Sequence, residues 1–211
     1  MIDLPADLPA ELAPLSWLLG VWEGTGVIDY GEHAYGGEFS HRVSFSHDGG
    51  DYLNYSAEAW LHGGPQDGSG DGQDAAASGT RTRLVSEMGY WRLARNATDA
   101  DAGPGLLPPL TGAPARTVDD IERLRNDEGG FDIEVSLVHA DGVSELYLGQ
   151  IRGPRIDIAT DAVVRPASAK SYAAATRMYG LVDNHLLWAW DIAALGLELG
   201  AHASARLAKV D

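Results

Sequence analysis

Few residues of this chain fall into patterns that are known to carry out chemistry. The sequence has no Walker phosphate loop, no His-Glu-x-x-His zinc helix and no Gly-x-Ser-x-Gly nucleophile elbow. It has no cysteine, which excludes disulfides, thiolate metal sites and a cysteine nucleophile. Its 31 acidic residues could include a catalytic pair, but most are expected on solvated faces. The remaining candidates are a glycine-rich motif around Trp22 and histidines within strand patterns.

One of these histidines, His202, lies near the C-terminus in the segment Gly-Ala-His-Ala-Ser-Ala-Arg-Leu. Strand alternation puts His202, Ser204 and Arg206 on one face, and the other face carries Ala201, Ala203, Ala205 and Leu207. If these small residues form a packed outer face, His202 points inward. A lone histidine on a strand is more often a surface residue or a satisfied core group than a ligand, so the segment alone does not decide its role.

The segment Gly20-Val-Trp-Glu-Gly-Thr-Gly26 stands where a helix is expected to end and the first strand to begin. Gly24 and Gly26 superficially resemble part of a dinucleotide-binding fingerprint, but the helix that should follow is missing. Glycines inside a strand permit close backbone approach at a barrel corner, and Trp22 is large enough to plug the end of a barrel. Both roles are structural.

The elements that must position these residues are mostly strands. A short helix is expected from about Leu8 to Leu19, because its leucines share a helical stripe. After Gly20 the dominant period is two, and Phe39, His41 and Val43 alternate with polar residues, so His41 lies on an apolar face. The same alternation returns in residues 53–59, 131–137, 144–151, 171–179, 185–193 and 201–210.

Turn sequences separate these segments, at residues 47–50, 140–142, 152–154 and 182–184. About ten consecutive strands with short turns favour closure, since an open sheet would leave two bare edges. The sequence therefore predicts an all-β fold, an antiparallel up-and-down β-barrel of about ten strands with a short N-terminal helix.

The length of 211 residues predicts a single domain over residues 1–211, with loop insertions at about 63–80 and 96–130. The run from Asp67 to Asp74 superficially resembles a calcium loop but lacks the terminal glutamate and flanking helices, so a solvated linker is expected. The second insertion is proline-rich, with a helical turn expected around Val118 to Leu124. Neither insertion is expected to contribute much to the core.

The net charge of -16 disfavours nucleic acid and anionic membrane surfaces as partners. Residues 1–13 show neither the basic region nor the apolar run of a secretory signal, so a cytoplasmic protein is expected. The expected partners are a small-molecule ligand and, in a homodimer, a second copy of the chain.

The spacing of Gly20, Trp22, Gly24 and Gly26 resembles the Gly-x-Trp-x-Gly-x-Gly signature of the nitrobindin family, haem-binding barrels related in shape to fatty-acid-binding proteins. Three further segments are similar to that family: Ser46-His-Asp-Gly49, Ser86-Glu-Met-Gly-Tyr90 and His139-Ala-Asp-Gly-Val-Ser-Glu145. The two long loops are extra.

This resemblance implies a haem b cofactor whose iron is bound by His202, which falls at the family's ligand position on the final strand. It also implies that Lys170 contacts the haem, where its ammonium can pair with a propionate; a solvated loop lysine is the alternative. Arg206 is a second candidate cation at the cavity mouth. The implied activity is isomerisation of peroxynitrite to nitrate, with binding of nitric oxide to ferrous haem, and the iron rather than a protein side chain does the chemistry.

One position departs from the family pattern. Val85 stands where several relatives carry a histidine before the Ser-Glu-x-Gly-Tyr stretch, so the side of the pocket opposite the iron ligand is expected to be more apolar. His41 and His47 are the candidates to replace the lost hydrogen bonding.

Two other functions fit the same fold. A closed barrel of this size can carry a fatty acid or another apolar ligand without being an enzyme, with Arg206 meeting a carboxylate. An interaction module that uses the two long loops is a weaker alternative.

Overall fold

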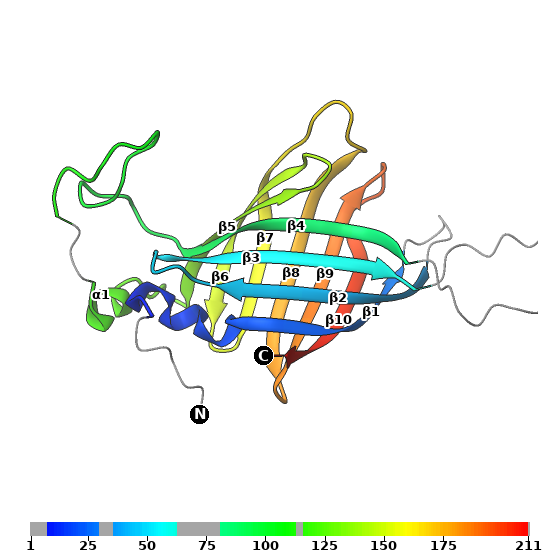
Figure 1. The fold of residues 1–211 in the computed structure, drawn as a ribbon, viewed down its shortest axis with the longest axis horizontal. Coiled ribbons are helices and arrows are strands. Elements are labelled where there is room, and N and C mark those ends of the chain that lie inside the picture. The colour runs from blue at the N-terminus through cyan, green and yellow to red at the C-terminus, as the bar shows by residue number, and fades with distance from the viewer. Residues whose placement is uncertain (1–7, 30–35, 63–80, 113–115, 211) are drawn as a thin grey trace, which may run out of the picture.

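The computed structural model describes residues 8–29, 36–62, 81–112 and 116–210. Their main feature is one closed antiparallel barrel of ten strands, ordered β1-β10-β9-β8-β7-β6-β5-β4-β3-β2 (Figure 1). The strands are β1 (Gly20–Asp29), β2 (Gly36–Ser46), β3 (Tyr52–Leu61), β4 (Thr82–Leu93), β5 (Phe131–His139), β6 (Ser144–Arg152), β7 (Arg155–Val164), β8 (Tyr172–Val182), β9 (His185–Ala194) and β10 (Gly200–Val210). The predicted barrel is confirmed.

Short turns hold neighbouring strands in register, as the sequence predicts. Asp183 and Asn184 connect β8 to β9 with φ angles of 50° and 59°. Two successive residues with positive φ are the geometry of the type I′ hairpin turn, which matches the twist of the flanking strands. The insertion at residues 63–80 lies outside the described residues.

The barrel closes where β1 pairs with β10, and the glycines of the motif make this seam possible. A Cβ atom on Gly24 would lie 2.2 Å from the carbonyl oxygen of Arg206, and one on Gly26 would lie 2.3 Å from that of Ser204. Trp22 is buried at the same seam, and its indole Nε1–H donates to the Leu18 carbonyl oxygen at 2.7 Å. The close backbone approach expected at Gly24 and Gly26 is therefore present.

The N-terminal helix is a 3-10 helix, η1 (Ala10–Leu18). Leu12, Leu15 and Leu18 recur every third residue and are fully buried. A 3-10 helix has three residues per turn, so this spacing puts all three leucines in one line along the barrel end. Pro14 lies inside the helix and has no N–H to donate.

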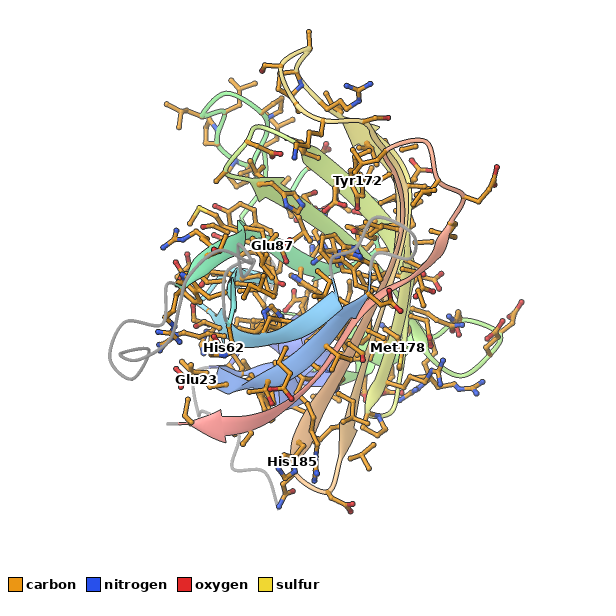
Figure 2. All side chains as sticks on the ribbon, turned by 90° about the vertical axis from the view of Figure 1, so that its right-hand side faces the viewer. Glu23, His62, Glu87, Tyr172, Met178 and His185 are labelled. Carbon is orange, nitrogen blue, oxygen red and sulfur yellow. The ribbon has the colours of Figure 1, made fainter. Side chains whose placement is uncertain are left out.

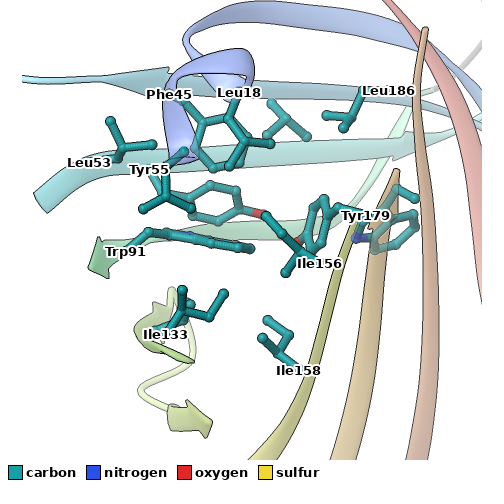
Figure 3. Packing of buried hydrophobic residues seen from close by; sticks show 14 of the residues in the cluster. Leu18, Phe45, Leu53, Tyr55, Trp91, Ile133, Ile156, Ile158, Tyr179 and Leu186 are labelled. Atoms are coloured by element: carbon teal, nitrogen blue, oxygen red, sulfur yellow. The ribbon is translucent and has the colours of Figure 1, made fainter. Parts of the chain in front are cut away.

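The barrel end next to η1 is filled by a hydrophobic cluster (Figure 3). The ring of Trp91 lies 5.4 Å from that of Phe45 and 5.1 Å from that of Tyr179, both edge-on. Such aromatic pairs add to the burial of apolar area, so this half of the barrel interior is a packed core.

The insertion at 96–130 contributes more to this end than the sequence predicts. Its helix α1 (Val118–Glu122) begins with a capping box between Thr117 and Asp120, which confirms the expected helical turn. Ile121 of α1 is buried in the main cluster, and Arg116 pairs with Glu11 of η1 at 2.9 Å. Figure 1 shows α1 and η1 at the same end of the barrel.

We expect Gly26→Ala to destabilise the barrel by roughly 1–3 kcal/mol, because the new methyl group must displace the β10 backbone. Gly112→Ala is the control, since no heavy atom lies within 4 Å of the Cβ position there. Urea unfolding of the two variants tests the seam, and equal stability would show that close strand approach does not constrain Gly26.

Candidate functional site

The opposite end of the barrel is hollow. A cavity of about 500 Å³ lies among the strand ends remote from η1, within the range of roughly 300–1,000 Å³ that is typical of small-molecule pockets. Its wall is mostly apolar, with Phe39, Trp188 and Trp190 supplying aromatic faces. Glu87 and Tyr172 line this cavity, whereas His185 and Glu23 do not; all four residues are labelled in Figure 2.

His202 lines this cavity because β10 contains a β-bulge. Ala201 pairs with Asp191 of β9 and Ala203 pairs with Trp190, so His202 is an extra residue between two paired ones. A bulge reorients the side chain of the inserted residue and shifts the alternation beyond it.

The alternation predicted for this strand was therefore wrong beyond His202. Ala205 and Leu207 are buried in the core, whereas Ser204 and Arg206 are exposed. Arg206 lies 3.3 Å from Nδ1 of His185 outside the cavity, so it is not a cation at the cavity mouth. His202 points inward as predicted, but through the bulge and not through alternation.

The surroundings of His202 favour a neutral imidazole. Desolvation lowers its pKa, while a hydrogen bond to the Asp29 backbone acts in the opposite direction. The ring also packs edge-on against Trp190 at 5.6 Å. A neutral imidazole that is oriented through one nitrogen is the form in which histidine binds metal ions.

The other residues predicted for the site have different positions. Lys170 lines the cavity from the exposed connection between β7 and β8, and it makes no ion pair with any other described residue. Val85 also lines the cavity, so the apolar wall expected there is present. His47 belongs to the turn between β2 and β3 and does not contribute to the cavity wall.

His41 is a buried wall residue, with 3% of its surface exposed. Its Nδ1 lies 3.2 Å from the Glu58 carbonyl oxygen, so Nδ1 carries the proton. Burial lowers the pKa of His41 to about 4, which leaves it neutral. Its Nε2 has no hydrogen-bond partner among the described residues and can therefore only accept.

A buried ion-pair network, which was not predicted from the sequence, borders the cavity. Arg177 of β8 donates from both terminal nitrogens to Glu87 of β4, at 2.6 and 2.9 Å. It also reaches Glu145 of β6 at 3.3 Å, and Glu145 in turn lies 2.7 Å from Nε2 of His139. Tyr147, Tyr172 and Tyr55 donate their hydroxyls to the same two carboxylates.

The pKa values in this network follow from the pairing. Burial alone raises the pKa of Glu87, but the Arg177 guanidinium outweighs it and lowers the pKa to about 2. Burial opposes the charge on Arg177, whereas Glu87 holds its pKa well above the usual value. Both groups are therefore charged at neutral pH although they are fully buried.

A sequence signal for this network existed. Arg177 lies between Ala175 and Tyr179 on β8, at a position where alternation demands a buried side chain. Glu145 similarly precedes the buried Tyr147 by two residues. Charged residues at inward positions of a barrel indicate an interior ion pair.

The network is an internal ion pair and not a metal centre. The potential ligand atoms of Glu87, His139 and Glu145 all lie within 4.8 Å of one another. However, Arg177 already supplies the cation, and both carboxylates accept hydrogen bonds from it and from tyrosine hydroxyls.

The cavity fits a flat, mostly apolar cofactor that carries a metal ion and an anionic edge. Trp188 and Trp190 line the cavity with aromatic rings, which suit the face of a flat apolar molecule. The Trp188 ring lies 4.7 Å from that of His41 and 5.9 Å from that of Trp190. Among the residues that line the cavity, His202 offers an imidazole nitrogen that could bind a metal ion, and Lys170 offers an ammonium group that could pair with an anionic edge.

Comparison with known proteins relates this chain to a family of haem-binding barrels. A protein-family model described as "THAP4-like, heme-binding beta-barrel domain" matches residues 11–209. A protein from Leifsonia xyli subsp. xyli is 59% identical over the full length of both chains, and one from Clavibacter michiganensis subsp. michiganensis is 56% identical over the same extent. Both carry the name peroxynitrite isomerase.

A solved structure shares the fold. The crystal structure of Rv2717c from M. tuberculosis superposes with a TM-score of 0.62, covers 99% of this chain and 100% of its own, and is 24% identical in sequence. At this identity the likeness concerns the barrel alone.

We expect Arg177→Met to cost roughly 3–5 kcal/mol of stability, because it leaves two carboxylates buried without their cation. Arg155→Met is the matched control: Arg155 pairs with Asp157 on the surface at 2.6 Å, and such exposed pairs contribute about 0–1 kcal/mol. Urea unfolding of both variants gives the comparison. Equal losses would mean that the buried network does not stabilise the barrel.

The lowered pKa of Glu87 predicts a loss of stability in acid. A carboxyl group with a depressed folded-state pKa stabilises the fold above its ordinary value of 4.5, and this contribution disappears as the pH falls from 4.5 towards about 2. The free energy of unfolding of Glu87→Gln should therefore decline less steeply than that of the wild type over this window. Parallel declines in chemical denaturation series would contradict the assigned pKa.

Proposed function

The chain belongs to the THAP4-like family of haem-binding β-barrels, the nitrobindin family, and on that premise we propose that it isomerises peroxynitrite to nitrate at a haem held in its cavity. The observation that carries the proposal is the neutral imidazole of His202, which the β10 bulge presents to a cavity of about 500 Å³. Full-length relatives named peroxynitrite isomerase support the reaction.

In this proposal the cofactor is haem b. The chain has no cysteine, so a haem cannot be attached through thioether bonds and must be held by ligation and packing. His202 would bind the iron, and Lys170 would pair with a propionate. Trp188 and Trp190, which line the cavity, would pack against the macrocycle.

The protein's contribution to the reaction is binding, orientation and exclusion of water. When bound, haem supplies an iron whose open coordination position accepts peroxynitrite or, in the ferrous state, nitric oxide. Substrate and product of the isomerisation have the same atoms and the same charge, so no side chain has to deliver or remove a proton. His202 would bind the iron, and Val85 contributes an apolar part of the cavity wall.

The carrier function is less well supported. It relied on Arg206 to meet a carboxylate, and Arg206 lies on the outer surface beside His185. None of the described helices is long and apolar enough to cross a membrane. A cytoplasmic location and a homodimer stay predictions from the sequence.

We expect His202→Ala to abolish the five-coordinate imidazole spectrum of the ferric haem complex while the far-ultraviolet circular dichroism stays that of the parent, because only a side-chain nitrogen is lost. His41→Ala should retain the spectrum. Haem titration followed by absorbance makes the comparison. A His202→Ala protein with the parent's haem affinity and spectrum would overturn the ligand assignment, and a parent that takes up no haem would favour the carrier function.

A further inference from the structure

We propose that His139, in its imidazolium form, donates a hydrogen bond to the anion bound at the haem iron, and so selects anionic over neutral ligands. The proposal rests on the proposed function, because it needs a haem on His202. It assigns a positioning and specificity role to a residue on the wall opposite the iron ligand.

The barrel topology places His139 across the cavity from His202. His139 ends β5 and His202 lies on β10, and these strands are five positions apart in either direction around the ring of ten. Both residues line the same cavity. Trp190 contacts both rings: its own ring is stacked 6.4 Å from that of His139 and lies edge-on 5.6 Å from that of His202.

The contacts of His139 determine which of its ring nitrogens can donate a hydrogen bond to a ligand. Its Nε2 lies 2.7 Å from Glu145 and 3.5 Å from Glu87. Its Nδ1 makes no hydrogen bond with any described residue. In the imidazolium both nitrogens carry protons, so Nε2–H satisfies the carboxylates while Nδ1–H remains for a ligand.

The buried charges favour that protonated form. The groups facing His139 are Glu87 from β4, Glu145 from β6, and Arg177 and Tyr172 from β8. Two carboxylates and one guanidinium leave an excess negative charge, which a protonated His139 neutralises. Burial lowers the pKa of His139, but the hydrogen bond to Glu145 and the charges of both carboxylates outweigh it, so the net shift is upward.

The other described polar groups of the cavity wall do not offer a cationic donor inside the cavity: Ser171 and Tyr172 carry neutral hydroxyls, and Asp141 is an acid. Val85 is apolar, and His41 is neutral and presents an acceptor nitrogen. Lys170 is cationic but belongs to the exposed connection at the mouth. A cationic donor that keeps its proton suits an isomerisation between two anions, since it stabilises the negative charge throughout and transfers nothing.

The test compares an anionic and a neutral ligand on the haem-loaded protein. Azide is titrated into the ferric form and carbon monoxide into the ferrous form, for the wild type, for His139→Gln and for the control His185→Gln, whose histidine lies outside the cavity. Loss of a charge-assisted hydrogen bond should weaken azide binding roughly ten- to hundredfold in His139→Gln, with carbon monoxide affinity unchanged. His185→Gln should match the wild type for both ligands.

The pH profile supplies a second measurement. Wild-type azide affinity should fall as the pH rises through the raised pKa of His139, by up to about tenfold per pH unit, and this decline should be absent in His139→Gln. An NMR titration of the His139 ring in the haem-free protein should give the matching midpoint. If His139→Gln does not fold, His139→Lys keeps a cation at the site and should retain azide binding to higher pH.

Three outcomes would overturn the proposal. Equal azide affinities of wild type and His139→Gln, with normal haem spectra, would refute it and leave the proposed function standing. A variant that binds haem weakly but azide normally once loaded would place His139 against a haem carboxylate instead. A wild type without a haem spectrum would refute the proposed function, and this inference with it.

Discussion

The buried guanidinium of Arg177 constrains the interior of this barrel, because it requires charged and polar partners from several strands. Arg177 is 2% exposed, and an unpaired charge at that depth would cost several kcal/mol. Glu87 and Glu145 meet it from β4 and β6, and tyrosine hydroxyls from β3, β6 and β8 complete their hydrogen bonding. Arg177 therefore ties β8 to β4 and β6, neither of which is its neighbour in the ring, at the level where the packed core ends and the cavity begins.

This network of Arg177, Glu87 and Glu145, called the charge layer below, explains why one end of the barrel can remain hollow. Below it, the aromatic cluster around Trp91 and the leucines of η1 fill the interior. Above it, the wall is held by backbone pairing and by the charge layer, so side chains can leave a space among them without collapse of the barrel. The bulge in β10 then brings His202 into that space, and His139 connects the charge layer to it.

The sequence predicts the barrel well because each strand alternates between one buried and one exposed face, and the turns carry residues that tolerate positive φ. It also predicts the structural roles of Gly24 and Trp22, because strands that approach closely require a residue without a side chain, and the sequence shows that glycine directly. The bulge at His202 leaves no such mark, because Ala201, Ala203 and Ala205 are equally compatible with either face. The ion pair was predictable in principle from Arg177 at an inward position, but its partners lie 90 and 32 residues away and alternation does not identify them.

The central claim is that a bulged histidine, set above a buried charge layer, holds a haem iron inside this cavity. The most direct measurement is a crystal structure of the ferric haem complex. The account predicts an iron bound to His202, a macrocycle between the Trp188 and Trp190 side and the Val85 wall, and an unchanged Arg177 network beneath it. An iron bound to His41 or His139, or a haem outside the cavity, would contradict it.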